Sequence, residues 1–192
     1  MQIIKNIAAS LILAASCAAP AFASVTQSTA PANYDSWYGW NWQPLGSVTL
    51  ATGTVRVSAL NSSARAWDQG WGYESMTENQ VYIGLFQNNT QLWAQHVAGG
   101  GHDTENLVQT YDIANDLPAL NSLNAALVGI DWTGAPVTMA IVASSVGWPG
   151  WSLHVADASF SVTSEVPEPA SLALIGLGLA GFAAARRKSL TK

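Results

Sequence analysis

Nine tryptophans lie between positions 37 and 151, and seven of them fall into three clusters. Exposed indole rings stack on the C–H faces of sugars while neighbouring Asn, Gln and Asp side chains bond the hydroxyls, so these clusters favour carbohydrate recognition. The alternative is packing, because Trp buries a large area. The other two, Trp93 and Trp132, lie within predicted strands and are assigned to the core. The candidate glycan-binding residues are Trp37, Trp40, Trp42, Trp67, Trp71, Trp148 and Trp151.

The histidines give weaker evidence for a functional site, which would be a metal site. His96 and His102 bracket a glycine-rich segment that is followed by Asp103 and Glu105. Such a loop contains metal ligands, but zinc or EF-hand spacing is missing, so a solvated hairpin loop is the preferred interpretation. His154 alternates with the apolar residues of the last predicted strand and is expected at the surface. No metal site and no cofactor is predicted.

The sequence contains residue types that could form a catalytic site, but it does not show that they lie together. The carboxylates of Glu74 and Glu78, or of Asp103 and Glu105, match a glycosidase pair in kind, but the separation that defines such a pair is spatial. A Ser-His-Asp arrangement is equally unconstrained, and a G-x-S-x-G elbow is missing. The GxGxxG spelling of residues 176–181 lacks the following acidic residue of a dinucleotide site. We therefore predict no enzymatic activity and no catalytic residues.

Short apolar stretches separated by Gly, Asn and Pro predict a mostly β fold, an antiparallel β-sandwich of jelly-roll-like type. Asn88-Asn89 is expected to form a hairpin turn, and Gly53 to mark a bulge. The expected strands are 48–50, 54–58, 81–86, 92–97, 126–132, 137–143 and 151–162.

The stretch 103–124 is predicted to contain one or two short helices. Leu107, Tyr111 and Ala114 fit one helix face. A second helical turn is predicted after Pro118, with Leu120, Leu123 and Leu127 on its apolar side.

Charge is unevenly distributed along the chain. Between the two apolar terminal segments the only basic residues are Arg56 and Arg65, whereas all twelve acidic residues lie there, so this part carries about 2 − 12 = −10 against −5 for the whole chain. Such a surface repels nucleic acid. It also disfavours anionic polysaccharide, unless calcium bridges the two.

The N-terminal residues resemble a secretory signal peptide. Lys5 precedes a mainly apolar stretch, 7–19, and Ala21 and Ala23 form an A-x-A site, so cleavage after Ala23 is predicted. Cys17, the only cysteine, lies in this segment. A lipoprotein-type cleavage before Cys17 is the alternative, but the large aliphatic residue that usually precedes such a site is missing. The mature protein is then free of cysteine and of disulfides.

The C-terminal residues have three parts. Pro167 and Pro169 favour an extended, non-helical stalk. Residues 170–185 carry no charge and would form a helix about 24 Å long, slightly short of a ~30 Å hydrocarbon core. The alternative is a buried helix, but an uncharged run that ends in three cations favours a membrane helix. The predicted membrane stop on the cytoplasmic side is Arg186, Arg187 and Lys188.

This tail resembles the PEP-CTERM sorting signal of bacterial surface proteins, and the resemblance covers only about the last 25 residues. It implies that Pro167, Glu168 and Pro169 are the sorting motif, recognised by an exosortase, a membrane-embedded protease-transpeptidase. It further implies export from a Gram-negative cell through the Sec translocon and signal peptidase. The C-terminal helix would anchor the protein transiently in the inner membrane before release to the cell surface or extracellular matrix.

These observations lead to a non-enzymatic surface or matrix protein whose body binds glycan or exopolysaccharide. Two alternatives remain open: a structural matrix protein with no specific ligand, and a small secreted glycan-active enzyme. The predicted domains are a signal peptide, 1–23, a β-sandwich, 24–165, and a sorting signal, 166–192, which comprises the membrane helix 170–185 and the basic tail 186–192.

Overall fold

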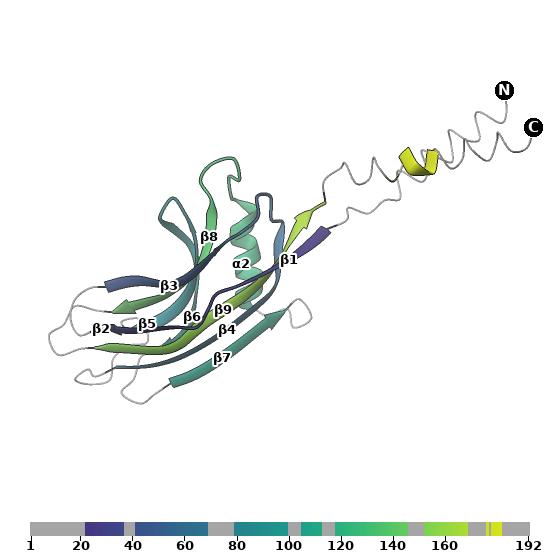
Figure 1. The fold of residues 1–192 in the computed structure, drawn as a ribbon. Helices are drawn as coiled ribbons and strands as arrows, with labels where there is room; N and C mark the ends of the chain where they lie inside the picture. The colour runs from purple at the N-terminus through teal and green to yellow at the C-terminus, as the bar shows by residue number, and fades with distance from the viewer. Residues whose placement is uncertain are drawn as a thin grey trace, which may run out of the picture. The chain divides into compact units, whose positions relative to one another are not determined.

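The computed structural model describes residues 22–36, 41–68, 79–99, 105–112, 118–145, 152–168, 176 and 178–181. Its contacts divide the chain into one unit of residues 24–166 and a second unit of residues 1–23 and 167–192. The first unit consists of two antiparallel sheets (Figure 1), which confirms the prediction of a mostly β protein with the sheets of a sandwich.

The first sheet, sheet A, has the strand order β1-β9-β4-β7, and β2 pairs with the first half of β9. The second, sheet B, has the order β3-β8-β5-β6. Apart from β1–β2 and the β5–β6 hairpin, successive strands of the chain alternate between the sheets, as in a jelly roll. The elements of sheet A are β1 (Phe22–Ser28), β2 (Ala32–Ser36), β4 (Arg56–Asp68), β7 (Glu105–Asp112) and β9 (Leu153–Pro167). Those of sheet B are β3 (Asn41–Thr49), β5 (Gln80–Gln87), β6 (Thr90–Gly99) and β8 (Val137–Ser145).

The strand ends gather at two opposite ends of the sandwich. We call the end at which β9 begins, at Leu153, the loop end, and the end at which it stops, at Pro167, the tail end. Strand register places the other termini, because Ser36 pairs with Leu153 and Asn41 with Ser145 at the loop end. Gln80 also lies there, paired with Ser144 and Gly99.

The helix α2 (Pro118–Val128) lies at the tail end. Its Asn124 side chain accepts a hydrogen bond from the Val57 amide (2.7 Å) and donates one to the Val57 carbonyl (3.0 Å), beside the first residues of β4. The three leucines predicted for its apolar side, Leu120, Leu123 and Leu127, are all buried, which confirms that helical turn.

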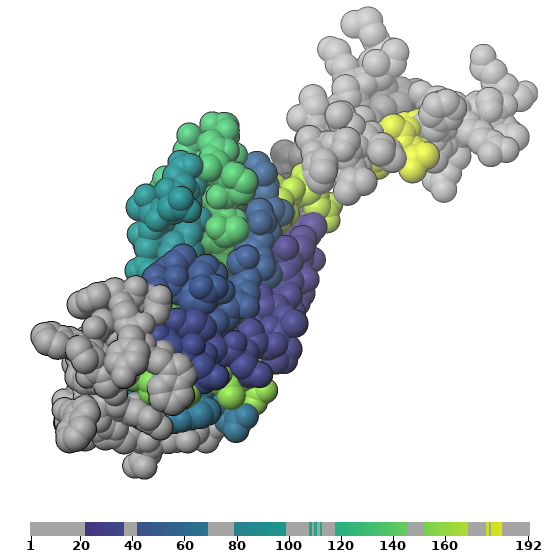
Figure 2. Space-filling view, turned by 60° about the vertical axis from the view of Figure 1, so that its left-hand side comes forward, coloured from purple at the N-terminus to yellow at the C-terminus, as the bar shows by residue number. Residues whose placement is uncertain are grey.

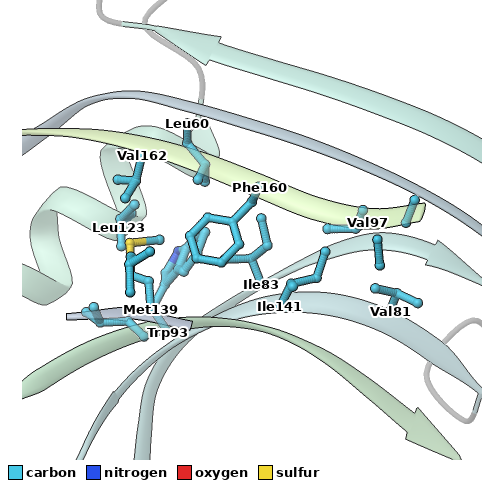
Figure 3. Packing of buried hydrophobic residues seen from close by; sticks show 14 of the residues in the cluster. Leu60, Val81, Ile83, Trp93, Val97, Leu123, Met139, Ile141, Phe160 and Val162 are labelled. Atoms are coloured by element: carbon cyan, nitrogen blue, oxygen red, sulfur yellow. The ribbon is translucent and has the colours of Figure 1, made fainter. Parts of the chain in front are cut away.

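The core lies between the sheets and follows the period of two that strands impose. In β5, Val81, Ile83 and Leu85 face the core, while Tyr82 and Phe86 belong to a separate cluster on the other face. Figure 3 shows Phe160 of β9 packed among residues that include Ile83 and Met139. Trp93 is buried as predicted, and its indole N–H donates to Ser122 Oγ of α2 at 2.8 Å. Trp132 packs partly buried against the same core, but from a turn rather than a strand.

Two turns contain residues with positive φ. Asn88 and Asn89 have φ of 52° and 60°, as a two-residue type I′ hairpin requires, so the predicted turn between β5 and β6 is confirmed. Gly53 has φ of 79°. It lies in a turn between β3 and β4, which belong to different sheets, so the prediction of a bulge was wrong.

Two other predictions were wrong. The expected strand 126–132 is the last part of α2 followed by a turn, because the leucine spacing of the preceding residues continues the helix. The expected helix at Leu107 and Tyr111 is the strand β7, which pairs with β4 along its length. A spacing of four residues fits one face of a helix but also one face of a strand. Pairing with β4, distant in sequence, decided between them.

Candidate functional site

Three aromatic side chains meet on the outer face of sheet B. Trp42 of β3 donates its indole N–H to the Tyr82 hydroxyl of β5. Its ring also meets Phe86 edge to face, with centroids 5.4 Å apart and an interplanar angle of 80°. Tyr82 and Phe86 are buried, whereas Trp42 remains 50% exposed. The cluster therefore fixes the orientation of one exposed indole.

Gly84 shapes this cluster. A Cβ at this position would come within 2.4 Å of the Phe86 ring, so the ring lies directly over the glycine backbone. Because Gly84 and Phe86 are two residues apart on one strand face, only a residue without a side chain allows the ring to lie flat there. The ring thereby forms a low apolar floor beside Trp42.

A groove of about 470 Å³ opens over this floor. Its lining combines apolar and neutral polar side chains, and none of them is charged. The lining residues are Trp42, Pro44, Ser47, Phe86, Asn89, Gln91, Thr138 and Ala140. A second hollow on the same face shares Gln91 and includes Tyr82 and His96.

Burial raises the pKa of the Tyr82 phenol above its usual value, and the hydrogen bond from Trp42 opposes this effect only in part. The phenol therefore stays neutral at any pH near 7 and adds no charge to this face. Uncharged hydroxyl and amide groups beside an exposed indole are suited to an uncharged, hydroxyl-rich ligand.

A second constellation lies at the loop end, on sheet A. His154 of β9 bonds Asp35 Oδ1 of β2 through Nδ1 (2.7 Å) and Ser152 Oγ through Nε2 (3.0 Å). Trp67 of β4 stacks on the imidazole, with centroids 5.3 Å apart and planes 16° apart. The prediction that His154 lies at the surface was wrong, since it is only 9% exposed. Its side chain does leave the core face, but its cross-strand neighbour Trp67 and the Asp35 carboxylate contact it there.

This Ser-His-Asp connection has the hydrogen-bond order of a nucleophilic triad. The exposed fractions of the serine and the aspartate are the reverse of those that a working triad needs. Ser152 is 3% exposed, whereas the Asp35 side chain is 66% exposed. A nucleophile must reach its substrate, whereas the carboxylate that orients the histidine is usually buried. We interpret the three residues as a polar connection that holds β2 against β9.

Replacing His154 with alanine should lower the free energy of unfolding by about 2–3 kcal/mol, because two hydrogen bonds and the Trp67 contact are lost while Ser152 remains buried. Urea unfolding of the purified protein measures this. The control is Thr133→Ala, which removes only a bond to Asp131 in an exposed turn and should cost less than about 0.5 kcal/mol. Equal effects of the two substitutions would contradict the role of His154.

The other predicted site residues divide into two groups. Of the candidate glycan-binding tryptophans, the structure describes Trp42 and Trp67, which lie on different sheets. Glu105 begins β7 in sheet A, whereas His96 lies in β6 of sheet B. Among the described residues, no group of three or more His, Cys, Asp or Glu side chains lies close enough to hold a metal ion. The candidates outside the described residues are Trp37, Trp40, Trp71, Trp148, Trp151, Glu74, Glu78, His102 and Asp103.

Some features of these two sites could be predicted from residues that are close in sequence, whereas others depend on pairing between distant strands. Ser152 and His154 are two residues apart, which places them on one face of a strand. Asp35 lies 119 residues from His154 and reaches it only through the β2–β9 pairing. Gly84 before Phe86 was a local signal for the aromatic floor.

The sorting motif begins at the end of β9. Pro167 is the last residue of the strand, and both Pro167 and Glu168 are exposed. Ala23 lies in β1 and is exposed. In the described part of the chain no helix has the length and apolar character needed to cross a membrane. Of the predicted membrane helix, only Gly176 and residues 178–181 are described, and they are helical. Ala21, Pro169 and the basic stop lie outside the described residues.

Comparisons with solved structures give only distant likenesses. The chain is similar to a structure of the infectious bursal disease virus Gt strain, with 12% identity, coverage of 79% of this chain and 35% of that chain, and a TM-score of 0.44. It is also similar to dimeric latent PorU from Porphyromonas gingivalis (9% identity, 76% and 13% coverage, TM-score 0.34). A cyclase from Fischerella sp. TAU gives 10% identity, 71% and 83% coverage and a TM-score of 0.29. The chain spans about a third of the viral chains.

Sequence comparison is decisive only at the C-terminus. No curated protein matches the chain significantly. Residues 165–188 match the PEP-CTERM protein-sorting motif, which includes the two prolines and the basic cluster. This chain therefore carries a PEP-CTERM sorting signal, the mark of an exported protein that is targeted to an exosortase.

Proposed function

We propose that the protein is a non-catalytic component of the bacterial surface or extracellular matrix, whose β-sandwich binds a neutral glycan in the groove beside Trp42. After Sec-dependent export and removal of the signal peptide, the helix 170–185 holds the protein in the inner membrane. Exosortase then processes the tail at the sorting motif and releases the body.

The groove is the observation that carries the glycan proposal. The Trp42 indole is held by Tyr82 and Phe86 yet half exposed, so its orientation is fixed before a ligand binds. Little side-chain entropy remains to be lost on binding, which favours affinity. The hydroxyls of Ser47 and Thr138 and the amides of Asn89 and Gln91 line the same groove and supply partners for sugar hydroxyls.

The absence of charged residues from the groove lining favours neutral over anionic polysaccharides. The exported part carries about −10 by sequence (2 basic and 12 acidic residues), while the groove lining carries no charge. An anionic polymer would meet the repulsion of the body without a cation in the groove to offset it. The ligand class is therefore a neutral hexose polymer, or neutral stretches of a matrix polysaccharide.

The absence of catalysis is part of the proposal. The burial of Ser152 argues against the hydrogen-bonded Ser-His-Asp set as a working nucleophile. A glycan that is bound but never cleaved, over hours of incubation, is the expected outcome.

Trp42→Ala should weaken binding of a neutral glucan about tenfold or more, because a buried or stacked Trp is among the residues that contribute most to an interface. Tryptophan fluorescence is titrated with dextran, with alginate, and with exopolysaccharide from the producing cells, each with calcium and then with chelator. The control is Val108→Ala, an exposed apolar residue on sheet A, which should bind as the wild type does.

Three outcomes decide the ligand class. Saturable binding of neutral glucan that is lost in Trp42→Ala supports the groove. Binding of alginate alone, and only with calcium, would replace the neutral ligand with an anionic one. No binding by a folded protein would leave the structural matrix protein as the better proposal.

A further inference from the structure

The last residues of β9 are held firmly on the side of β4. Glu165 pairs in register with Arg56, and its carbonyl accepts a hydrogen bond from the Val55 amide at 2.9 Å. The Glu165 carboxylate also accepts two bonds from the Arg56 guanidinium, from Nε at 2.7 Å and from Nη2 at 3.0 Å. Such a two-point contact fixes geometry as well as contributing energy.

The other side of β9 is covered by β1. The Thr29 amide donates to the Phe160 carbonyl at 2.9 Å, and the hydroxyls of Thr26 and Thr163 lie 2.9 Å apart. These contacts place Thr29 opposite Phe160 and Thr26 opposite Thr163, as in an antiparallel pair of strands. Continuing the same register places Ser24 opposite Glu165. Figures 1 and 2 show β1, in purple, beside the yellow-green end of β9. Glu165 therefore lies between two strands.

The sorting signal begins inside this sheet. Its match starts at residue 165, and Val166 alone separates Glu165 from Pro167. A peptide bond must lie in an extended, unpaired segment to enter a protease, and a strand with partners on both sides does not offer one. The folded sandwich and the processing signal thus meet without a linker.

We infer that the Arg56–Glu165 pair is a clamp that sets the upstream limit of processing, so that exosortase acts only beyond Val166 and releases the sandwich with β9 complete. This inference rests on the proposed processing of the tail. In that step one peptide bond on the C-terminal side of Val166 breaks and the tail leaves with a new amino terminus. The acyl group is transferred to water, which gives a carboxylate, or to an amine acceptor, which gives an amide. The clamp takes no part in the chemistry and acts through the position of the strand.

The chain provides a matched control for the clamp. Arg65 and Asp157 form an exposed ion pair of the same chemistry (2.6 Å) across the same two strands, β4 and β9. Asp157 lies eight residues before Glu165, so this pair is distant from the sorting motif. A substitution of Arg65 therefore tests the effect of losing a surface charge while the clamp stays intact.

The experiment expresses full-length wild type, Arg56→Gln, Arg56→Lys and Arg65→Gln in exporting cells that contain exosortase. Intact mass of the released protein gives its C-terminus. The wild type and Arg65→Gln should give one C-terminus beyond Val166. Arg56→Gln should add shorter species that end before Glu165, and Arg56→Lys, which keeps the charge but not the two-point contact, should give fewer of them.

A second measurement is independent of exosortase. Purified precursor is digested with proteinase K, and cleavage at residues 163–166 is followed by mass. Because cleavage follows the population of the open strand, its rate should rise about fivefold in Arg56→Gln, the most that an exposed ion pair usually contributes. It should not change in Arg65→Gln.

The outcomes separate the two proposals. If the wild-type tail stays intact in the presence of exosortase, the proposed processing fails, while the digestion still tests the clamp. If the tail is processed but Arg56→Gln equals the wild type in both measurements, the clamp is wrong and the processing stands.

Discussion

Replacing Phe160 with alanine is expected to lower the free energy of unfolding by about 3–5 kcal/mol. Phe160 lies in the middle of β9 with its ring buried between the sheets, among residues of sheet B such as Ile83 and Met139 (Figure 3). Truncation removes the ring and leaves a cavity that two rigid sheets do not close. A loss of this size is a large part of the 5–15 kcal/mol that usually separates folded from unfolded domains.

The backbone at this position should keep its place in Phe160→Ala. The Phe160 amide donates to Thr29 Oγ1 (3.0 Å), and its carbonyl accepts from the Thr29 amide, so strand pairing does not depend on the ring. Urea unfolding measures the change. The control Val108→Ala, at a residue 76% exposed on β7, should alter the free energy of unfolding by no more than about 0.5 kcal/mol. A Phe160→Ala effect as small as that of the control would contradict the assignment of this ring to the core.

Replacing Pro167, Glu168 and Pro169 together with alanine is expected to abolish processing of the tail. The prolines keep the residues before them out of helical geometry, whereas alanine is the best helix former. The triple variant therefore loses both the motif and the break between β9 and the predicted membrane helix. Precursor should accumulate in the membrane fraction at full mass, with no released form.

The control for this variant is Pro31→Ala, which changes an exposed proline between β1 and β2 and leaves the tail unaltered. It should be processed as the wild type is. Normal release and trimming of the triple alanine variant would show that these three residues are not the signal that exosortase reads.

The fold was predictable where a signal was local. The Asn88-Asn89 dipeptide indicated a hairpin turn, and alternation within β9 indicated which of its side chains face the core. The sorting signal was predictable because it is a linear motif.

Features that depend on pairing between distant residues were not predictable in this way. The spacing of Leu107 and Tyr111 fits both a helix and a strand, and only β4 selects the strand. His154 is buried because Trp67 and Asp35 come from two other strands. The groove needs Trp42 of β3 beside Phe86 of β5, which is not adjacent to β3 in sheet B.

The placement of β9 has a mechanical consequence. It is a long inner strand of sheet A, with β1 and β2 on one side and β4 on the other, and the tail continues directly from its end. A body attached to a surface through this end is pulled along the axis of β9, and antiparallel ladder bonds lie perpendicular to that direction. The bonds on both sides then resist the load together in shear, rather than opening singly as they would if an edge strand were peeled away. For a body held through its tail, the point of attachment would therefore also be the place where the sandwich best withstands tension.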